Sequence, residues 1–315
     1  MEEITNNKNT MDKQPLVSII VITYNSSKYV LETLESAKAQ TYQNIELIIS
    51  DDCSTDNTVE ICRQWLEENK ERFVRTKLIT VEKNSGIPAN CNRGVRASKG
   101  EWVKLIAGDD ALKKKCINDN ISIVLSNNKI SILQTNVDYY NDNFKSSNFI
   151  KTSSVETNPF FTKTNNADDQ YRMIIYGNKV IAPSIFIKRD VINNVGGYDE
   201  DIPLMEDLSF WSKITKNGYR ISYNNAVTVN YRLHSQSATK GEFNIMSISY
   251  AKGLLIYNKK YKKNNVNNLH YNAYNLGLYL IIFQNKANTL INNVFVNKVF
   301  SKLSSMVMKL GAPKI

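Results

Sequence analysis

The feature that most constrains this chain is a regular alternation, over residues 16–106, of short apolar runs with segments of helical periodicity. The runs Leu16–Thr23 and Ile45–Ile49 are rich in β-branched residues, which predicts strands buried on both faces. Between them, the segment Ser26–Ala37 has apolar residues at helical spacing. Strands of this kind are typical of parallel sheets whose crossover helices cover both faces. The sequence therefore predicts an α/β fold with a mostly parallel central sheet flanked by helices.

The same alternation continues along the chain. It predicts helices over 56–66, 88–97, 117–125 and 208–215, and strands over 77–81, 102–106, 130–139 and 181–188. The polar segment Asn141–Asn166 interrupts the pattern and predicts a mobile loop that could serve as a lid.

Positive charge is concentrated at the C-terminal end. The chain has a net charge of +10, and residues 243–315 contain ten lysines, no arginine and no acidic residue. We therefore divide the chain into a disordered leader (1–14), an α/β domain (15–242) and a basic helical C-terminal extension (243–315). A basic extension with apolar stripes suits an anionic membrane surface or an acidic partner rather than nucleic acid. The alternative is an element for packing or homo-oligomerisation.

The apolar runs are also informative about location. None approaches the roughly 20 residues that span a bilayer, and the four cysteines lack metal-binding spacing. We expect a cytoplasmic protein with reduced thiols and no zinc, in peripheral contact with the inner face of the cell membrane.

Polar residues gather directly after three of the predicted strands, as Thr23–Asn25, Asp51–Ser54 and Asp109–Asp110. Open α/β sheets bind ligands at this edge, although any one cluster could simply supply helix caps and turns. The chain has no glycine-rich phosphate loop, so a phosphorylated ligand must be held in another way. A divalent metal on Asp109–Asp110 is the natural substitute, because hard cations prefer oxygen ligands.

A second acidic pair, Glu206–Asp207, precedes a helix whose Phe210 and Trp211 suit the core. Acidic residues at a helix N-terminus also have a purely structural explanation in the helix dipole. His234, one of two histidines, lies in the segment Tyr231–Ser235 and is either a ligand or an ordinary buried residue.

Six segments, in order along the chain, carry a family resemblance. They are VSIIVITYN (17–25), ELIISDDCSTDNT (46–58), NSGIPANCNRG (84–94), KGEWVKLIAGDD (99–110), GGYDE (196–200) and MEDLSFW (205–211). Together they resemble the family 2 glycosyltransferases, which have the GT-A fold. The resemblance makes 15–242 the GT-A catalytic domain and implies an inverting, metal-dependent hexosyltransferase or related enzyme.

The resemblance also implies roles for individual residues. Asp51 would accept a hydrogen bond from the imide N–H of uracil, and the full set of donor-nucleotide residues is Thr23, Tyr24, Asn25, Asp51, Asn92 and Asp109. The predicted ligands of Mn²⁺ or Mg²⁺ are Asp109, Asp110 and His234.

Asp207 would be the catalytic base that deprotonates the acceptor hydroxyl. The residues expected to contact the acceptor or the transferred sugar are Glu206, Trp211, Gly197 and Tyr198. Inversion predicts a β-linked product from an α-linked donor.

The expected reaction is sugar transfer from a nucleotide-sugar, favoured as a UDP-sugar, to a glycan or lipid-linked glycan acceptor. The expected process is bacterial surface polysaccharide synthesis: capsule, O-antigen or exopolysaccharide. Two departures from the family pattern, Ala107 and Cys91, support the alternative of a sugar-nucleotide-binding pseudoenzyme.

Overall fold

The structure, a computed structural model, describes residues 14–202, 204–234, 248–288, 302–303 and 306. Almost all of the predicted leader (1–14) and parts of the extension (243–315) lie outside these residues.

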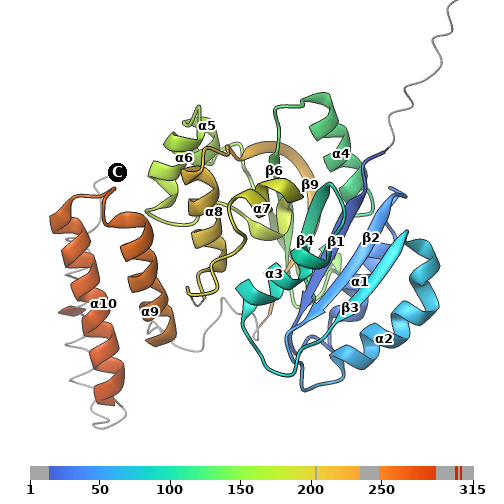
Figure 1. The fold of residues 1–315 in the computed structure, drawn as a ribbon, viewed down its shortest axis with the longest axis horizontal. Coiled ribbons are helices and arrows are strands. Elements are labelled where there is room, and N and C mark those ends of the chain that lie inside the picture. The colour runs from blue at the N-terminus through green and yellow to red at the C-terminus, as the bar shows by residue number, and fades with distance from the viewer. Residues whose placement is uncertain (1–13, 203, 235–247, 289–301, 304–305, 307–315) are drawn as a thin grey trace, which may run out of the picture.

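One half of the central sheet is parallel (Figure 1). Its strands lie in the order β3 (Arg75–Ile79), β2 (Ile45–Asp51), β1 (Val17–Thr23) and β4 (Trp102–Ala107). Alternate residues of β1 face opposite sides of the sheet. Ile20 belongs to the hydrophobic cluster that includes residues of α3 (Ile87–Ala97). Ile19 and Val21 belong to a second cluster, which includes residues of α1 (Val30–Lys38) and α2 (Thr58–Asn69). The predicted alternation of strands and helices is therefore present, with helices on both faces.

The other half of the sheet is mixed. It continues from β4 through β8 (Ile185–Lys188), β6 (Ile132–Asn141) and β9 (Ser222–Leu233) to β5 (Ala111–Leu112). β8 is antiparallel to both β4 and β6, while β9 is parallel to β6. The sequence did not predict β9, which brings residues 230–233 beside the chain that follows β4.

The predicted loop Asn141–Asn166 contains regular secondary structure that the sequence did not predict, while its mobility as a lid stays a prediction. This segment contains a 3₁₀ turn (Ser146–Asn148), strand β7 (Phe149–Thr152) paired with β6, and helix α5 (Pro159–Thr162). Phe160 and Phe161 are buried in the core, whereas the residues of β7 are exposed. Similarly, the first part of the predicted strand 181–188 is a 3₁₀ turn, Ala182–Ser184.

The remaining helices lie around the mixed half of the sheet. They are α4 (Cys116–Ser126), α6 (Ala167–Ile174), α7 (Arg189–Asn194) and α8 (Glu206–Lys216), with one further 3₁₀ turn at Lys70–Arg72.

The described part of the C-terminal extension is helical. It contains α9 (Ile248–Tyr257), a π-helical turn (Asn258–Lys262) and α10 (Asn268–Asn288), which lie at the end of the molecule opposite α2 (Figure 1). The Tyr257 hydroxyl is 2.7 Å from Ser212 Oγ of α8, and the Tyr261 hydroxyl donates to Asp199 at 2.5 Å. These buried contacts join the extension to the core of the α/β domain. Among the described residues, no helix is both long enough and apolar enough to cross a membrane.

Candidate active site

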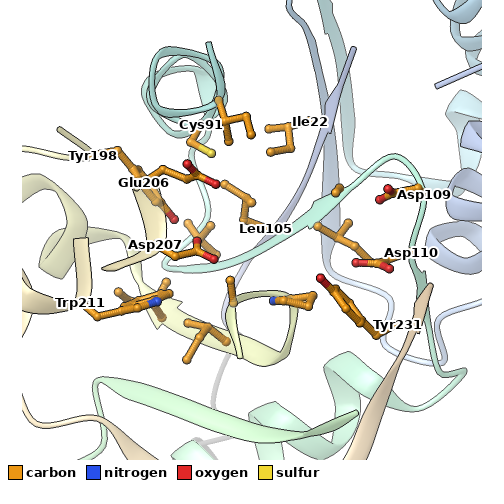
Figure 2. A pocket seen from close by; sticks show the side chains of 18 of the residues that line it. Ile22, Cys91, Leu105, Asp109, Asp110, Tyr198, Glu206, Asp207, Trp211 and Tyr231 are labelled. Atoms are coloured by element: carbon orange, nitrogen blue, oxygen red, sulfur yellow. The ribbon is translucent and has the colours of Figure 1, made fainter. Parts of the chain in front are cut away.

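Two adjoining cavities lie at the carboxyl edge of the parallel strands. The outer cavity, about 480 Å³, is lined by the ends of β1 and β4, by Asp52, by the loop and first turn around Asn84–Asn90, and by Glu200, Leu204 and Glu206. The inner cavity, about 190 Å³, is mostly apolar and is drawn in Figure 2. The residues common to both linings are Ile22, Ile87, Ala107, Asp109 and Glu206.

Acidic side chains face the inner cavity from two sides. Figure 2 shows Asp109 and Asp110 after β4 on one side, and Glu206 and Asp207 of α8 on the other, with Leu105 between them. The fold thus brings together two acidic pairs that are almost 100 residues apart in the chain.

Asp109 and His234 are in direct contact, with 3.0 Å between Asp109 Oδ2 and His234 Nε2. Asp110 does not join them, because its Oδ1 accepts a hydrogen bond from the Arg232 backbone N–H at 2.8 Å. Burial, followed by the charge of Asp109, raises the pKa of Asp110 well above its ordinary value. Among the residues the structure describes, no three His, Cys, Asp or Glu side chains converge as a metal cluster. Of the three predicted metal ligands, Asp109 and His234 are thus in direct contact in this structure, while Asp110 is hydrogen-bonded to the Arg232 backbone.

Arg232 holds this acidic corner together, a role that the sequence analysis did not assign. Its side chain is buried and donates to the backbone oxygens of Asp109 at 2.6 Å and Asp142 at 2.5 Å, and to Glu32 Oε2 at 2.5 Å. It also lies 4.5 Å from the centre of the Tyr29 ring. The only sequence signal for it was its place in the YRLHS segment, two residues before His234.

The pair Glu206–Asp207 begins helix α8, as the sequence predicted. Burial, followed by the charge of Glu206, raises the pKa of Asp207 to about 7. Burial also raises the pKa of Glu206, whose Oε2 is buried without a hydrogen-bond partner among the described residues. A carboxyl group with a pKa near neutrality can accept a proton at physiological pH, as a general base must.

The GGYDE segment forms the wall next to this pair. Tyr198 lines the inner cavity and stacks on Phe210, with ring centroids 3.9 Å apart. Gly197 has a φ of +70°, and a Cβ there would lie 2.5 Å from the Asn92 side-chain oxygen, so only glycine fits. Trp211 is buried and also lines the inner cavity, with its indole N–H unpartnered in the described structure.

Asn92, predicted to bind the donor nucleotide, lies against the GGYDE loop. Its amide oxygen accepts from the Tyr198 N–H at 2.8 Å, and its NH₂ group donates to the Tyr198 carbonyl and to Glu200 Oε1. It lines neither cavity. These bonds hold the amide against the GGYDE loop, so the predicted donor contact would require Asn92 to exchange these partners.

Some of the residues predicted to bind the nucleotide line the outer cavity. Thr23 and Tyr24 line it, and half of the Tyr24 side chain is exposed. Asn25, with a φ of +50°, accepts from the Thr55 N–H through its side chain. Asp51 is fully buried and accepts from Thr23 Oγ1 at 2.7 Å and from both donors of Ser54. Its predicted contact with the base would require an exchange of one of these partners.

Among the residues that the structure describes, no Lys or Arg lines the outer cavity. Asp52 accepts from the Ser85 and Gly86 N–H groups and pairs with Arg93 at 2.6 Å, which fixes the rim of the cavity. Arg93 and Arg96 are both engaged, the latter with Glu200. Cys91 is buried in the wall of the inner cavity, and burial raises the pKa of its thiol well above the ordinary value.

A parallel half-sheet with acidic strand ends, extended by a mixed half that carries a second acidic pair, is the GT-A architecture of sugar-transferring enzymes. The chain belongs to glycosyl transferase family 2: the family's sequence model matches residues 18–189. It is accordingly a glycosyltransferase.

Curated relatives carry the same assignment. An uncharacterized glycosyltransferase of Haemophilus influenzae is 27% identical over 234 residues, which are 73% of this chain and 69% of the relative. Glycosyltransferase GlyG of Streptococcus pneumoniae is 37% identical over 102 residues, 32% of this chain and 33% of the relative. The match to a Rickettsia felis glycosyltransferase spans 72% of this chain and 35% of that relative, so some relatives are much longer than the matched part.

Solved structures share the fold. S. aureus TarS residues 1–349 in complex with UDP-GlcNAc has a TM-score of 0.61 at 18% identity and covers 95% of this chain and 82% of its own. The mannosyltransferase PcManGT of Pyrobaculum calidifontis, in complex with GDP-Man and Mn²⁺, has a TM-score of 0.56 at 17% identity, with coverages of 96% and 85%. At these identities the likeness concerns the fold alone.

Proposed function

We propose that the chain catalyses inverting transfer of a sugar from a UDP-sugar to a glycan or lipid-linked glycan acceptor. The observation that carries this proposal is the pair Glu206–Asp207 facing Asp109 across one cavity. The outer cavity would hold the nucleotide and the inner cavity the reacting sugar. The TarS structure with UDP-GlcNAc supports a uridine donor by likeness of fold.

In the proposed step, Asp207 accepts the proton of the acceptor hydroxyl as that oxygen bonds to the anomeric carbon. The bond between the anomeric carbon and the diphosphate oxygen breaks, and its electron pair leaves on the diphosphate. Attack from the face opposite the leaving group inverts the configuration. Trp211 and Tyr198 would form the wall against which the sugar lies.

The protein would supply some of the ligands of a divalent cation at the acidic corner formed by Asp109 and His234. Asp109 and His234 offer one oxygen and one nitrogen ligand, a set that suits Mn²⁺, and diphosphate and water oxygens would complete the coordination. When bound, such an ion neutralises charge on the departing nucleoside diphosphate. Arg232 is the only Lys or Arg that lines the two cavities among the described residues, and it is already engaged by Asp109, Asp142 and Glu32.

Nucleotide binding tests the proposal directly. We expect calorimetric titration of the full chain to show UDP binding in the presence of Mn²⁺ or Mg²⁺, and affinity at least about tenfold weaker with a chelator, because two phosphates would otherwise meet acidic side chains without a cation. GDP, TDP and CDP are the comparison ligands. Absence of binding by all four nucleotides with metal would reject the enzyme and favour the alternative of an inactive protein disabled at Ala107 and Cys91.

The wider role that we propose is synthesis of a bacterial surface polysaccharide, at the inner face of the cell membrane. Helix α10 supports a membrane contact. Its exposed residues Leu269, Leu276, Tyr279 and Phe283 recur at intervals of seven, three and four, so they form one apolar stripe. The extension also contains ten lysines and no acidic residue, which suits anionic lipid. Packing against a second copy of the chain is the competing use of this stripe.

Vesicle sedimentation separates these uses. We expect the full chain to sediment with anionic vesicles but not with neutral ones, and less strongly at high salt. Changing Leu276 and Phe283 to glutamine should weaken sedimentation at least about tenfold, since each side chain would lose about 1.5–3 kcal/mol of burial. Leu125→Gln, at an exposed position on α4, is the matched control. Equal sedimentation of all three proteins would remove the membrane role from α10.

A further inference from the structure

A third cavity lies where the C-terminal extension meets the start of α8. Its volume is about 330 Å³. The extension supplies Tyr250, Leu254, Lys262 and Tyr274, and the α/β domain supplies Tyr176–Asn178 and Leu204–Leu208. It shares Glu206 and Asp207 with the inner cavity, so it reaches the proposed catalytic base from the side away from Asp109. We call it the extension cavity.

Lys262 is the one cationic side chain that lines the extension cavity in the described structure. Its ammonium group lies 4.7 Å from the centre of the Tyr274 ring and 5.8 Å from that of Tyr257. No described carboxylate lies within 4.0 Å of it, whereas its neighbour Lys260 pairs with Asp199 at 2.9 Å. Burial alone lowers the pKa of Lys262 to about 8, so the group is still mostly protonated at pH 7. A half-buried cation that lies beside aromatic rings and has no described carboxylate within ion-pair distance is stabilised when an anion reaches it.

The rest of the lining suits a sugar chain. Tyr176 and Tyr250 are partly exposed, and together with Tyr274 they offer apolar ring faces as well as hydroxyl groups. Ligand sites of this kind combine aromatic walls with a few polar groups that fix orientation. Leu204 and Leu208 add apolar surface next to the carboxyl pair.

We propose that the extension cavity is the acceptor site of the transferase and that the acceptor is an anionic glycan, whose phosphate or carboxylate group binds Lys262 while its sugars lie against the tyrosines. This inference rests on the proposed function, because it places the acceptor hydroxyl at Asp207. It also gives the extension a role in the reaction: a change in the extension residues that line the cavity would change acceptor choice without touching the donor site.

The test uses the full chain and three oligosaccharides of equal length: one whose sugars are joined through phosphodiester groups, an oligogalacturonate and a neutral maltooligosaccharide. Binding is measured by calorimetry in the presence of UDP and Mn²⁺. We expect at least one of the two anionic oligomers to bind and the neutral one to bind at least about tenfold more weakly. The anionic oligomer that binds identifies phosphate or carboxylate as the recognised group.

Lys262→Met keeps the length of the side chain and removes its charge. We expect it to weaken anionic oligomer binding at least about tenfold, to leave UDP affinity unchanged, and to leave the thermal midpoint equal or higher, because a half-buried charge without a carboxylate partner is lost. Lys263→Met, at the exposed neighbouring position, should change nothing. Unchanged oligomer affinity in Lys262→Met, equal binding of the neutral oligomer, or no binding of any oligomer would overturn the inference. Failure of UDP to bind the unmodified chain would instead overturn the proposed function.

Discussion

Replacing Asp207 with asparagine is expected to lower kcat for sugar transfer by about 10²- to 10⁴-fold while leaving UDP affinity unchanged. The asparagine amide has the shape of the carboxylate but cannot take a proton from the acceptor hydroxyl. Asp207 lies across the inner cavity from Asp109, so the nucleotide end of the site is not altered. Product formation and UDP titration on the same preparation measure the two effects.

The pH dependence of kcat/KM provides a second test of this prediction. Because the pKa of Asp207 is about 7, kcat/KM should rise about tenfold per pH unit below pH 7 and level off above it. Glu206→Gln is the matched control: it removes the charge that raises the pKa of Asp207, so the rise should move to lower pH with the plateau retained. Loss of the plateau in Glu206→Gln, with activity retained in Asp207→Asn, would make Glu206 the base. If cells that carry Asp207→Asn or Glu206→Gln make the same glycans as cells with the unmodified chain, the results favour the sugar-nucleotide-binding pseudoenzyme.

The raised pKa of Asp207 also has a consequence for stability. The folded state holds the proton more tightly than the unfolded state, whose Asp pKa is about 3.9. This contribution to stability is present below pH 3.9 and is lost as the pH rises through about 7. Asp207→Asn should therefore be more stable than the unmodified chain at pH 8, by on the order of 1–4 kcal/mol, and equal to it at pH 3.5. Urea unfolding at the two pH values measures this difference.

Replacing Arg232 with methionine is expected to lower the free energy of unfolding by about 3 kcal/mol or more. The change leaves the carbonyl oxygens of Asp109 and Asp142 without their donor and Glu32 without its partner. We also expect metal-dependent UDP affinity to fall at least about tenfold, since Asp109 would no longer be held beside His234. Urea unfolding and calorimetry are the measurements.

Two control variants show whether Arg232 acts by position or by charge. Arg232→Lys keeps a positive charge but cannot reach three oxygens from one nitrogen, so it should lose most of the same stability. Arg63→Met removes an exposed cation that pairs only with Glu60, and it should cost less than about 0.5 kcal/mol. Full stability and UDP affinity in Arg232→Lys would mean that charge alone suffices.

The parallel half of the fold and the positions of the acidic pairs were predictable from local patterns. Strands β1, β2 and β4 are short, apolar and closely spaced, and the polar residues that follow them fall at one sheet edge wherever the strands pair in parallel. The pair Glu206–Asp207 was found from its motif before helix α8.

The segments that failed to follow prediction lack such a pattern. Asn141–Asn166 is polar in composition and mostly exposed, yet its Val155, Phe160 and Phe161 are buried in the core. Strand β9 has an irregular alternation of buried and half-buried residues, because its register with β6 shifts along its length. The hydrogen bonds of Asn92 to Tyr198 and of Asp51 to Thr23 join residues 106 and 28 positions apart, which no local signal reports.

By itself, the sequence determined the α/β class, the family, the two acidic pairs and the charge of the extension, because each is written in residues close together along the chain. Only the tertiary structure decided that Arg232 holds Asp109, that Asn92 supports the GGYDE loop, and that Lys262 enters a cavity shared with Asp207. The physical reason is that hydrogen bonding and burial depend on which distant segments the sheet and the C-terminal helices bring into contact.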